Sequence, residues 1–394
     1  MPKTDVTPYD PANPLYTLTD GQLDALGKEF DALHDEIFAE LGDTDARYIR
    51  NMIKLQRQLV ALSRGALLFS RFKPAWVAGT AALSVAKILE NMEIGHNVMH
   101  GQWDWMNDPN IHSSTWDWDT ASPAAAWKHS HNYVHHTYTN IIGKDKDVGY
   151  EIFRVDARQK WNPAYLLQPI GNIVLMAAFE WGVALHDLDF DKIKTGEKSR
   201  KQVWDELKGI GRKARRQILK DYVAYPALSG RNGYKSTLAA NAVANVVRNV
   251  WSNAIIFCGH FPDQTFMFTE EEVENETRGG WYVRQLIGAA NIDGSPLFHV
   301  MSGNLSFQVE HHLYPDMPSS RYGQIAPRVK EICERYGLPY NTGPLSKQWG
   351  TVQRTILRLA FPGGGPRRKP GAYVMPAQER AELEHLREQV PAFP

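Results

Sequence analysis

Three clusters of histidines, separated by long stretches of chain, constrain the fold more than any other feature of this sequence. They read HNVMH, HNYVHH and QVEHH. Their polar members are His96, His100, His131, His135, His136, Gln308, His311 and His312. Residues four apart on a helix share one face, with Cβ atoms about 5–6 Å apart, so each cluster can direct two side chains at one point. We therefore expect a fold that brings the clusters together around metal.

The number and type of these ligands favour two redox-active metals. The chain has 14 histidines in 394 residues, so a lone HxxxH is expected by chance roughly half the time, whereas HxxxHH has an expectation of about 0.02. Seven imidazoles exceed the needs of one four-coordinate zinc, and His260, in FCGH, is the candidate eighth. Zinc, copper, iron and nickel all suit imidazole. Two irons could use dioxygen to attack an unactivated C–H bond, whereas zinc has no redox chemistry.

Composition excludes several classes of protein. Lys plus Arg equals Asp plus Glu at 44 each, which gives no indication of nucleic-acid binding. Cys258 and Cys333 are the only cysteines, which excludes a disulfide framework, a Cys-rich zinc module and an iron–sulfur cluster held by this chain alone. The N-terminus MPKTDVTPYD lacks a signal-peptide pattern, so we expect any membrane insertion to use internal segments.

Four internal segments are apolar, but each is shorter or more polar than a confident spanning helix of about 20 apolar residues. The strongest are 165–185 and 238–259, and the weaker pair 59–70 and 74–89 resembles a helical hairpin. A mean hydropathy of −0.42 predicts substantial water-exposed mass around them. Helices buried in a soluble protein are the alternative interpretation.

Charged residues inside these segments limit how they can sit in a membrane. Lys87, Glu180 and Arg248 would be costly in lipid, so we expect them to face protein or the cytosolic end. If 165–185 and 238–259 each cross once, the second and third clusters share one side. The basic stretch within 191–220 then lies on the other side, against the positive-inside tendency. A re-entrant or interfacial segment is the alternative.

The rest of the chain has a simple organisation. Thr19 or Asp20 can cap an amphipathic helix that runs to about residue 41. We expect a polar N-terminal segment over 1–44, a main domain over 45–345 and a C-terminal extension over 346–394. The first histidine cluster follows the apolar run that ends at Leu89, so the same helix is expected to carry it.

The clusters, with HLYPDMPSSR after the third, resemble the histidine boxes of the integral-membrane fatty acid desaturase family. The stretch ENMEIGHNVMHGQWDWMNDP is most similar to the actinobacterial stearoyl-CoA delta-9 desaturases. The resemblance covers about residues 45 to 345. It implies an all-α fold of about four transmembrane helices in the cell membrane, with a cytosolic cap that holds a diiron centre.

The same resemblance implies the reaction and its participants. A saturated fatty acyl-CoA, with a stearoyl or palmitoyl chain, would lose two hydrogens in an oxygen-dependent reaction. Electrons would come from NAD(P)H through a separate reductase, because the chain lacks the HPGG signature of a fused cytochrome b5 domain. The implied iron ligands are His96, His100, His131, His135, His136, His260, His311 and His312. The third box begins with Gln308 in place of histidine, and Gln308 could bind metal, donate a hydrogen bond or hold a water.

Other residues are weaker candidates. Asp145, Asp147 and Glu310 could orient the imidazoles as carboxylates behind them, or could be solvated surface charges. Asn253 and Asn304 could fix a metal-bridging water, although capping or turn formation is the simpler expectation. The histidines outside the boxes are expected to be structural, and include His112, His129, His186 and His299.

Alternative functions remain at this point. An acyl-lipid desaturase, or a hydroxylase acting on fatty acids or alkanes, could use the same diiron scaffold. The way in which the site holds the substrate's hydrocarbon chain decides which product forms. A membrane transporter or sensor could use histidine clusters without catalysis. Such a protein would need polar groups along the membrane path, whereas these boxes flank the apolar segments.

Overall fold

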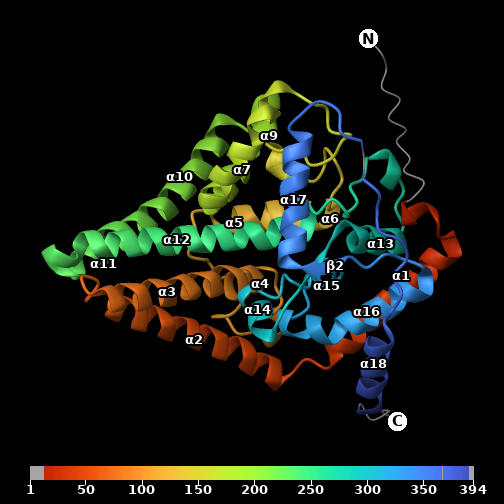
Figure 1. Ribbon diagram of the computed structural model, residues 1–394, viewed down its shortest axis with the longest axis horizontal. Coiled ribbons are helices and arrows are strands. Elements are labelled where there is room, and N and C mark those ends of the chain that lie inside the picture. The colour runs from red at the N-terminus through yellow and green to blue at the C-terminus, as the bar shows by residue number, and fades with distance from the viewer. Residues whose placement is uncertain (1–12, 366, 390–394) are drawn as a thin grey trace.

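The structure is a computed structural model that describes residues 13–365 and 367–389, and nearly all its regular structure is helical (Figure 1). The predicted all-α class is confirmed. Residues 1–12 of the predicted N-terminal segment lie outside the described residues. The described strands are β1 (Asn291–Asp293) and β2 (Thr342–Pro344), which pair in parallel and so connect two segments that are about 50 residues apart in the sequence.

A capping box begins the first long helix, α1 (Asp20–Ala39). The Thr19 hydroxyl accepts a hydrogen bond from the Gln22 backbone N–H, and the Gln22 side chain accepts one from the Thr19 N–H. The predicted N-terminal helix is therefore confirmed. Its apolar face is buried against α13 (Arg278–Gly288) and α16 (Tyr322–Tyr336) in an aromatic-rich core.

The predicted hairpin is formed by α2 (Asp43–Leu67) and α3 (Lys73–Leu89). The long helix α12 (Gly230–His260) packs against α3, with Leu67 and Leu83 contacting Ala240 and Ala244. These helices converge with α10 (Arg200–Ile218) and α11 (Tyr225–Leu228) at one end of the molecule, opposite α1 and α16 (Figure 1). We call these five helices the wedge.

The apolar run 165–185 does not form one straight helix. It is divided into α7 (Gln168–Ala177) and α8 (Phe179–His186) because Ala178 has φ −111° and ψ 27°, outside the helical region. In the described part of the chain, no single helix has both the length and the apolar composition of a membrane span; the pair Pro163–Ala177 and Phe179–His186 meets those criteria together, with a 103° bend. Of the two interpretations of 165–185, the bend fits a broken or re-entrant segment better than a straight crossing.

The basic stretch within 191–220 forms α10 and runs along the wedge towards α11, where the chain turns back into α12 (Figure 1). A widened π-helical segment, η7 (Leu219–Ala224), joins α10 to α11. The stretch is therefore largely helical and not a loop. Within the wedge, α12 packs mainly against α3, and η7 and α11 also contact it.

The charges predicted to avoid lipid are buried among protein groups. Lys87 and Arg64 both form ion pairs with Asp221, and Arg248 forms one with Glu180. Each of these acidic and basic side chains has at most a tenth of its surface exposed. Pairing is what makes burial of such groups tolerable.

We call the end of the molecule that contains α1, α13 and α16 the cap, and the remaining helices complete it. They are α5 (Ala124–Trp127), α6 (His136–Tyr138), α9 (Phe190–Thr195), α14 (Pro296–Met301), α15 (Gln308–Leu313), α17 (Leu345–Leu359) and α18 (Ala377–Gln389). The short 3-10 segments are η1 (Pro14–Tyr16), η3 (Asp104–Met106), η5 (Val148–Glu151), η6 (Pro163–Leu167), η8 (Glu271–Val273) and η9 (Ser319–Arg321).

Candidate metal centre

The first two histidine boxes lie on widened helical turns. Helix α3 continues into the π-helical segment η2 (Glu90–His96) and then into α4 (Asn97–Met99), which confirms that one extended helix carries the first box. The second box lies on another π-helical segment, η4 (Lys128–His135), followed by α6. The expectation of regular α-helical spacing was wrong here. Single π-turns inside helices are rare and occur often at functional sites.

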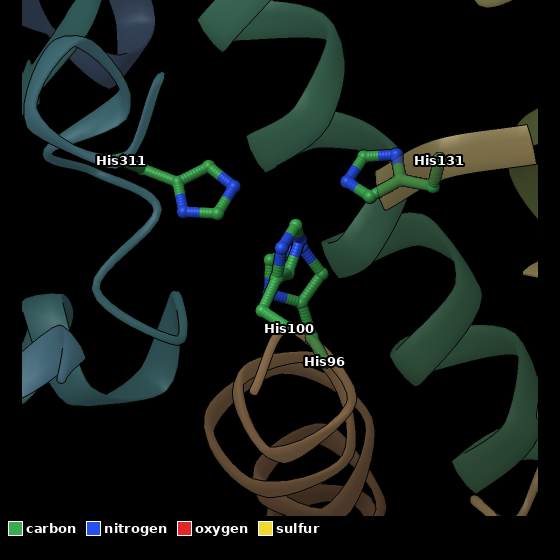
Figure 2. A group of neighbouring side chains, drawn as sticks. All are labelled: His96, His100, His131 and His311. Carbon is green, nitrogen blue, oxygen red and sulfur yellow. The ribbon is translucent and has the colours of Figure 1, made fainter. Parts of the chain in front are cut away.

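The box histidines gather into two adjacent groups. His96, His100, His131 and His311 form the four-histidine group, and Figure 2 shows their rings directed towards a common centre from three separate parts of the chain. His135, His260 and His312 form the three-histidine group. Within each group, one ring nitrogen from every member lies within 4.8 Å of the others. That spacing can accommodate one metal ion in each group.

His136 lies between the two groups. Its ring centroid is 4.8 Å from that of His100 in the four-histidine group and 4.6 Å from that of His312 in the three-histidine group. Both of its ring nitrogens are buried and have no hydrogen-bond partner in the described structure. All eight predicted histidines therefore meet in one place.

Two carboxylates orient imidazoles of the second box. Asp145 lies 3.0 Å from Nδ1 of His135, and Asp147 lies 3.3 Å from Nδ1 of His131. Asp147 also lies 3.0 Å from Nε2 of His186. A carboxylate that accepts the Nδ1 proton leaves the Nε2 lone pair free for metal. The predicted orienting contacts of Asp145 and Asp147 are present.

Neutral groups orient the imidazoles of the third box. The Tyr322 hydroxyl donates to the Tyr314 carbonyl oxygen, so it accepts the proton from Nδ1 of His311 at 3.1 Å. The Gln285 amide oxygen accepts from Nδ1 of His312 at 3.0 Å. In both histidines the hydrogen bond selects the tautomer with an available Nε2 lone pair.

Several ring nitrogens of the box histidines have no hydrogen-bond partner in the described structure. Buried nitrogen atoms without a hydrogen-bond partner include Nε2 of His100, His131, His135, His136 and His311. An unpaired buried polar atom is costly, and such atoms are rare in native proteins. Their concentration at one point fits the binding of metal, which would supply the missing partner to each.

Burial keeps most of these imidazoles neutral. Desolvation lowers the pKa of His96 to about 3 and holds the pKa values of His100, His136 and His311 well below the usual range, with neighbouring imidazoles adding to the effect. For His135, burial also acts to lower the pKa, but the Asp145 carboxylate outweighs it and raises the value. Neutral imidazole is the form that binds metal.

Gln308 contacts the three-histidine group directly. Its Nε2 lies 3.0 Å from Nε2 of His260, and its Oε1 is buried without a partner. Gly259 makes this approach possible, because a Cβ at residue 259 would lie 2.8 Å from the Gln308 side chain. The lack of a side chain at Gly259 on α12 therefore allows the third box to approach His260 closely.

Two weaker candidates face away from the histidines. Asn304 has φ 55° and donates to Glu93 at 3.0 Å, which fits the turn role. Glu310 is buried and accepts from Asn291 and Tyr340, so in the described structure it neither contacts an imidazole nor lies at the surface as a solvated charge. Successive residues on a helix point about 100° apart, which explains why Glu310 and its neighbour His311 face different surroundings.

Asn253, a predicted candidate, is buried two turns before His260 on α12, with both amide atoms unpartnered in the described structure. Its role in holding a water stays a prediction.

The structure adds contacts that the sequence did not predict. His186, expected to be structural, contacts Asp147. Tyr322 and Gln285 have no motif around them that indicates their roles. The Asn97 amide oxygen accepts a hydrogen bond from Nδ1 of His96 at 3.0 Å, and the repeated His-Asn pair in the first two boxes is the signal that could have identified it.

A narrow cavity adjoins both groups. Its wall includes His96, His131 and His260, together with apolar side chains such as Phe179 and Ile256. A second cavity lies against the outer surface and shares Ser130, His186 and Asp187 with the first. These shared side chains lie between the two cavities, and we call them the neck.

Comparison with known proteins places the chain in a family. The model of the family "fatty acid desaturase" matches residues 74–344. An NADPH-dependent stearoyl-CoA 9-desaturase of Mycobacterium tuberculosis is 50% identical over 348 residues, covering 88% of this chain and 82% of the relative. An sn-1 linoleoyl-lipid 6-desaturase of Synechocystis is 24% identical, over 79% of this chain and 89% of that protein. This chain is a member of the fatty acid desaturase family.

Proposed function

We propose that this desaturase introduces a double bond into a saturated acyl-CoA of about the length of stearoyl-CoA, using two irons held by its histidine groups. The observation that supports this most is the meeting of eight buried or partly buried imidazoles, several with unpartnered Nε2 atoms, beside a partly apolar cavity. Acyl-CoA desaturation explains both features. A site that only stores metal would not need the cavity.

The four-histidine group would hold one iron and the three-histidine group the other, with His136 placed to serve either. Bound iron would supply the redox chemistry that dioxygen-dependent removal of hydrogen requires. The protein's own part is to keep the imidazoles neutral by burial and to fix their tautomers through Asp145, Asp147, Gln285 and Tyr322. Gln308 would complete the second site directly or through a water.

The two cavities support an acyl chain with a polar headgroup. The inner cavity would take the hydrocarbon, and the neck at Ser130, His186 and Asp187 would lead to the headgroup. Lys198 and Arg212 are among the basic residues that line the outer cavity. Their positive charges would favour the phosphates of a CoA headgroup. The Mycobacterium tuberculosis relative is named for stearoyl-CoA, which supports the same class of substrate.

Electrons would come from NADPH through a separate reductase. The name of the same relative includes NADPH dependence. Both histidine groups are buried, so a partner protein would have to deliver electrons through the cap and not by direct contact with iron. The expected location is the cell membrane with the cap in the cytosol.

Exposed apolar side chains at the tip of the wedge support membrane attachment. Phe69, Phe72 and Val77 lie at or near the turn between α2 and α3, and Leu228 lies in α11. Each has more than half of its surface exposed. Large exposed apolar patches are characteristic of contact with membrane or protein. In the proposed arrangement the tip enters the lipid and the cap remains outside.

The test is turnover by purified protein with ferrous iron, a reductase, NADPH, oxygen and stearoyl-CoA. We expect a mono-unsaturated product, identified by mass spectrometry after derivatisation of the double bond. His135→Ala should abolish turnover and lower bound iron, whereas His112→Ala, outside both groups, should preserve both. A product that is only hydroxylated would contradict desaturation, and full activity of His135→Ala would contradict the assigned ligands.

A further inference from the structure

The inner cavity follows one face of α12 away from the metal centre. Its lining residues on this helix are Arg248, Asn249, Ser252, Ile256 and His260. Steps of about four residues place side chains on the same helical face. Arg248 and His260 are twelve residues apart, which is about 18 Å along the helix axis. The cavity therefore has one end at the metal centre and the other three turns away.

Helix α8 forms the facing wall with the same ordering. His186 and Asp187 lie at the neck, Val183 lies one turn further in, and Glu180 lies another turn further. Glu180 forms an ion pair with Arg248, and Gln217 donates to Glu180 at 2.8 Å. The far end of the cavity is thus crossed by an ion pair that joins its two walls.

This ion pair is buried and held in place. The side chains of Arg248 and Glu180 are 2% and 4% exposed. Arg248 also donates to the carbonyl oxygen of Asp119 at 3.4 Å. The ion pairs of Lys87 and Arg64 with Asp221 belong to the same wedge but do not line the cavity. A hydrocarbon end that displaced the Arg248–Glu180 pair would leave buried charges without partners, which is strongly unfavourable.

We propose that the Arg248–Glu180 ion pair is the floor of the acyl cavity and sets the longest chain that the enzyme accepts. This inference rests on the proposed acyl-CoA desaturation. An extended chain advances about 1.25 Å per carbon, given a C–C bond of about 1.5 Å. The nine carbons beyond C9 of a stearoyl chain then need roughly 11 Å. The side chains of the iron-ligating histidines at one end and of Arg248 at the other would occupy the rest of the 18 Å.

The direct test removes both members of the pair. A single substitution would strand one buried charge and destabilise the fold, so the variant is Arg248→Ala with Glu180→Ala. We measure kcat/KM for saturated acyl-CoA substrates from C14 to C22. The variant should favour longer chains, with the C20 to C18 ratio rising by about tenfold or more, because each methylene in an apolar pocket is worth 10-fold or more in specificity. An unchanged optimum would overturn the inference.

A second variant shortens the cavity. Ser252 lies one turn above Arg248 on the lining face, so Ser252→Leu should raise the floor and favour chains of C14 to C16. This variant tests the inference even if the double variant does not fold. A Ser252→Leu enzyme that keeps its preference for C18 would argue against a length limit at this end.

The matched control changes the neighbouring ion-pair group, which does not line the cavity. Lys87→Gln and Arg64→Gln with Asp221→Asn should leave the chain-length optimum in place, whatever the effect on yield. An equal shift in this control would mean that general loosening of the wedge sets chain length, and would overturn the inference. Wild-type protein inactive on every acyl-CoA would instead contradict the proposed function.

Discussion

At the scale of single residues, the centre depends on hydrogen bonds that select tautomers. Asp145 and Asp147 follow the second box closely in sequence, so their role could be predicted from proximity. Tyr322 and Gln285 come from other helices and reach the imidazoles only through the tertiary fold. Short motifs report the residues that bind directly, whereas the residues behind them depend on packing that no local pattern encodes.

Removing the Tyr322 hydroxyl tests this role. Tyr322→Phe keeps the ring in the core but takes away the acceptor for Nδ1 of His311, so we expect a 10- to 100-fold loss of iron affinity or activity. Tyr340→Phe is the matched control, because that hydroxyl donates to Glu310 and not to a histidine. Iron titration of both variants, at equal folded fraction, makes the comparison. Equal iron binding by the two would contradict a role for Tyr322 in ligand orientation.

The neutral imidazoles also predict a dependence of stability on pH. The pKa of His96 is lowered to about 3 in the folded protein, whereas an unfolded histidine titrates near its usual value of about 6.5. The unfolded chain therefore binds more protons between these values, and iron-free protein should lose stability as the pH falls below about 6.5. Each such histidine contributes a slope approaching 1.4 kcal/mol per pH unit. Urea unfolding between pH 7.5 and 5.5 measures it, and a flat profile would contradict buried neutral histidines.

At the scale of elements, spacing predicted which helices carry the boxes but not their local geometry. The α2–α3 hairpin and its extension through His100 follow from the apolar pattern and were predicted. The π-turns in η2 and η4 were not, because a widened turn has no distinct hydrophobic period. The bend at Ala178 was missed for a similar reason, since no proline or glycine interrupts the sequence there.

The junction of α12 with α15 offers a test at this scale. Gly259→Ala places a Cβ 2.8 Å from Gln308, so we expect a loss of about 1–3 kcal/mol in unfolding free energy and weaker iron binding. Gly65→Ala in α2 meets no atom within 4 Å and should be neutral or stabilising by up to about 1 kcal/mol. Denaturant unfolding of both variants gives the comparison. No penalty at residue 259 would show that α15 does not pack closely there.

At the scale of the whole molecule, the wedge and cap divide two tasks. Helix α12 of the wedge lines the cavity away from the centre. The cap brings distant parts of the sequence together around the centre (Figure 1). The convergence of the boxes could be predicted from their chemistry. The reversal of the chain through η7 and α11 into α12 could not, because the hydropathy of 191–220 does not indicate where the chain turns back.

Membrane attachment through the tip is testable by substitution. Phe69 is 61% exposed at the turn between α2 and α3, and Phe69→Ser should weaken partitioning into lipid vesicles by about tenfold or more. Val374→Ser, at an exposed position outside the wedge, is the control and should have little effect. Flotation with vesicles measures both. Equal recovery of the two variants would contradict insertion of the tip.

The central claim is that the two histidine groups hold a pair of irons side by side. Anomalous X-ray scattering from crystals of the iron-loaded protein, measured on both sides of the iron absorption edge, tests it most directly. We expect two iron peaks, one in the four-histidine group and one in the three-histidine group, near His136. A single peak, or a signal that appears only at the zinc edge, would contradict the account.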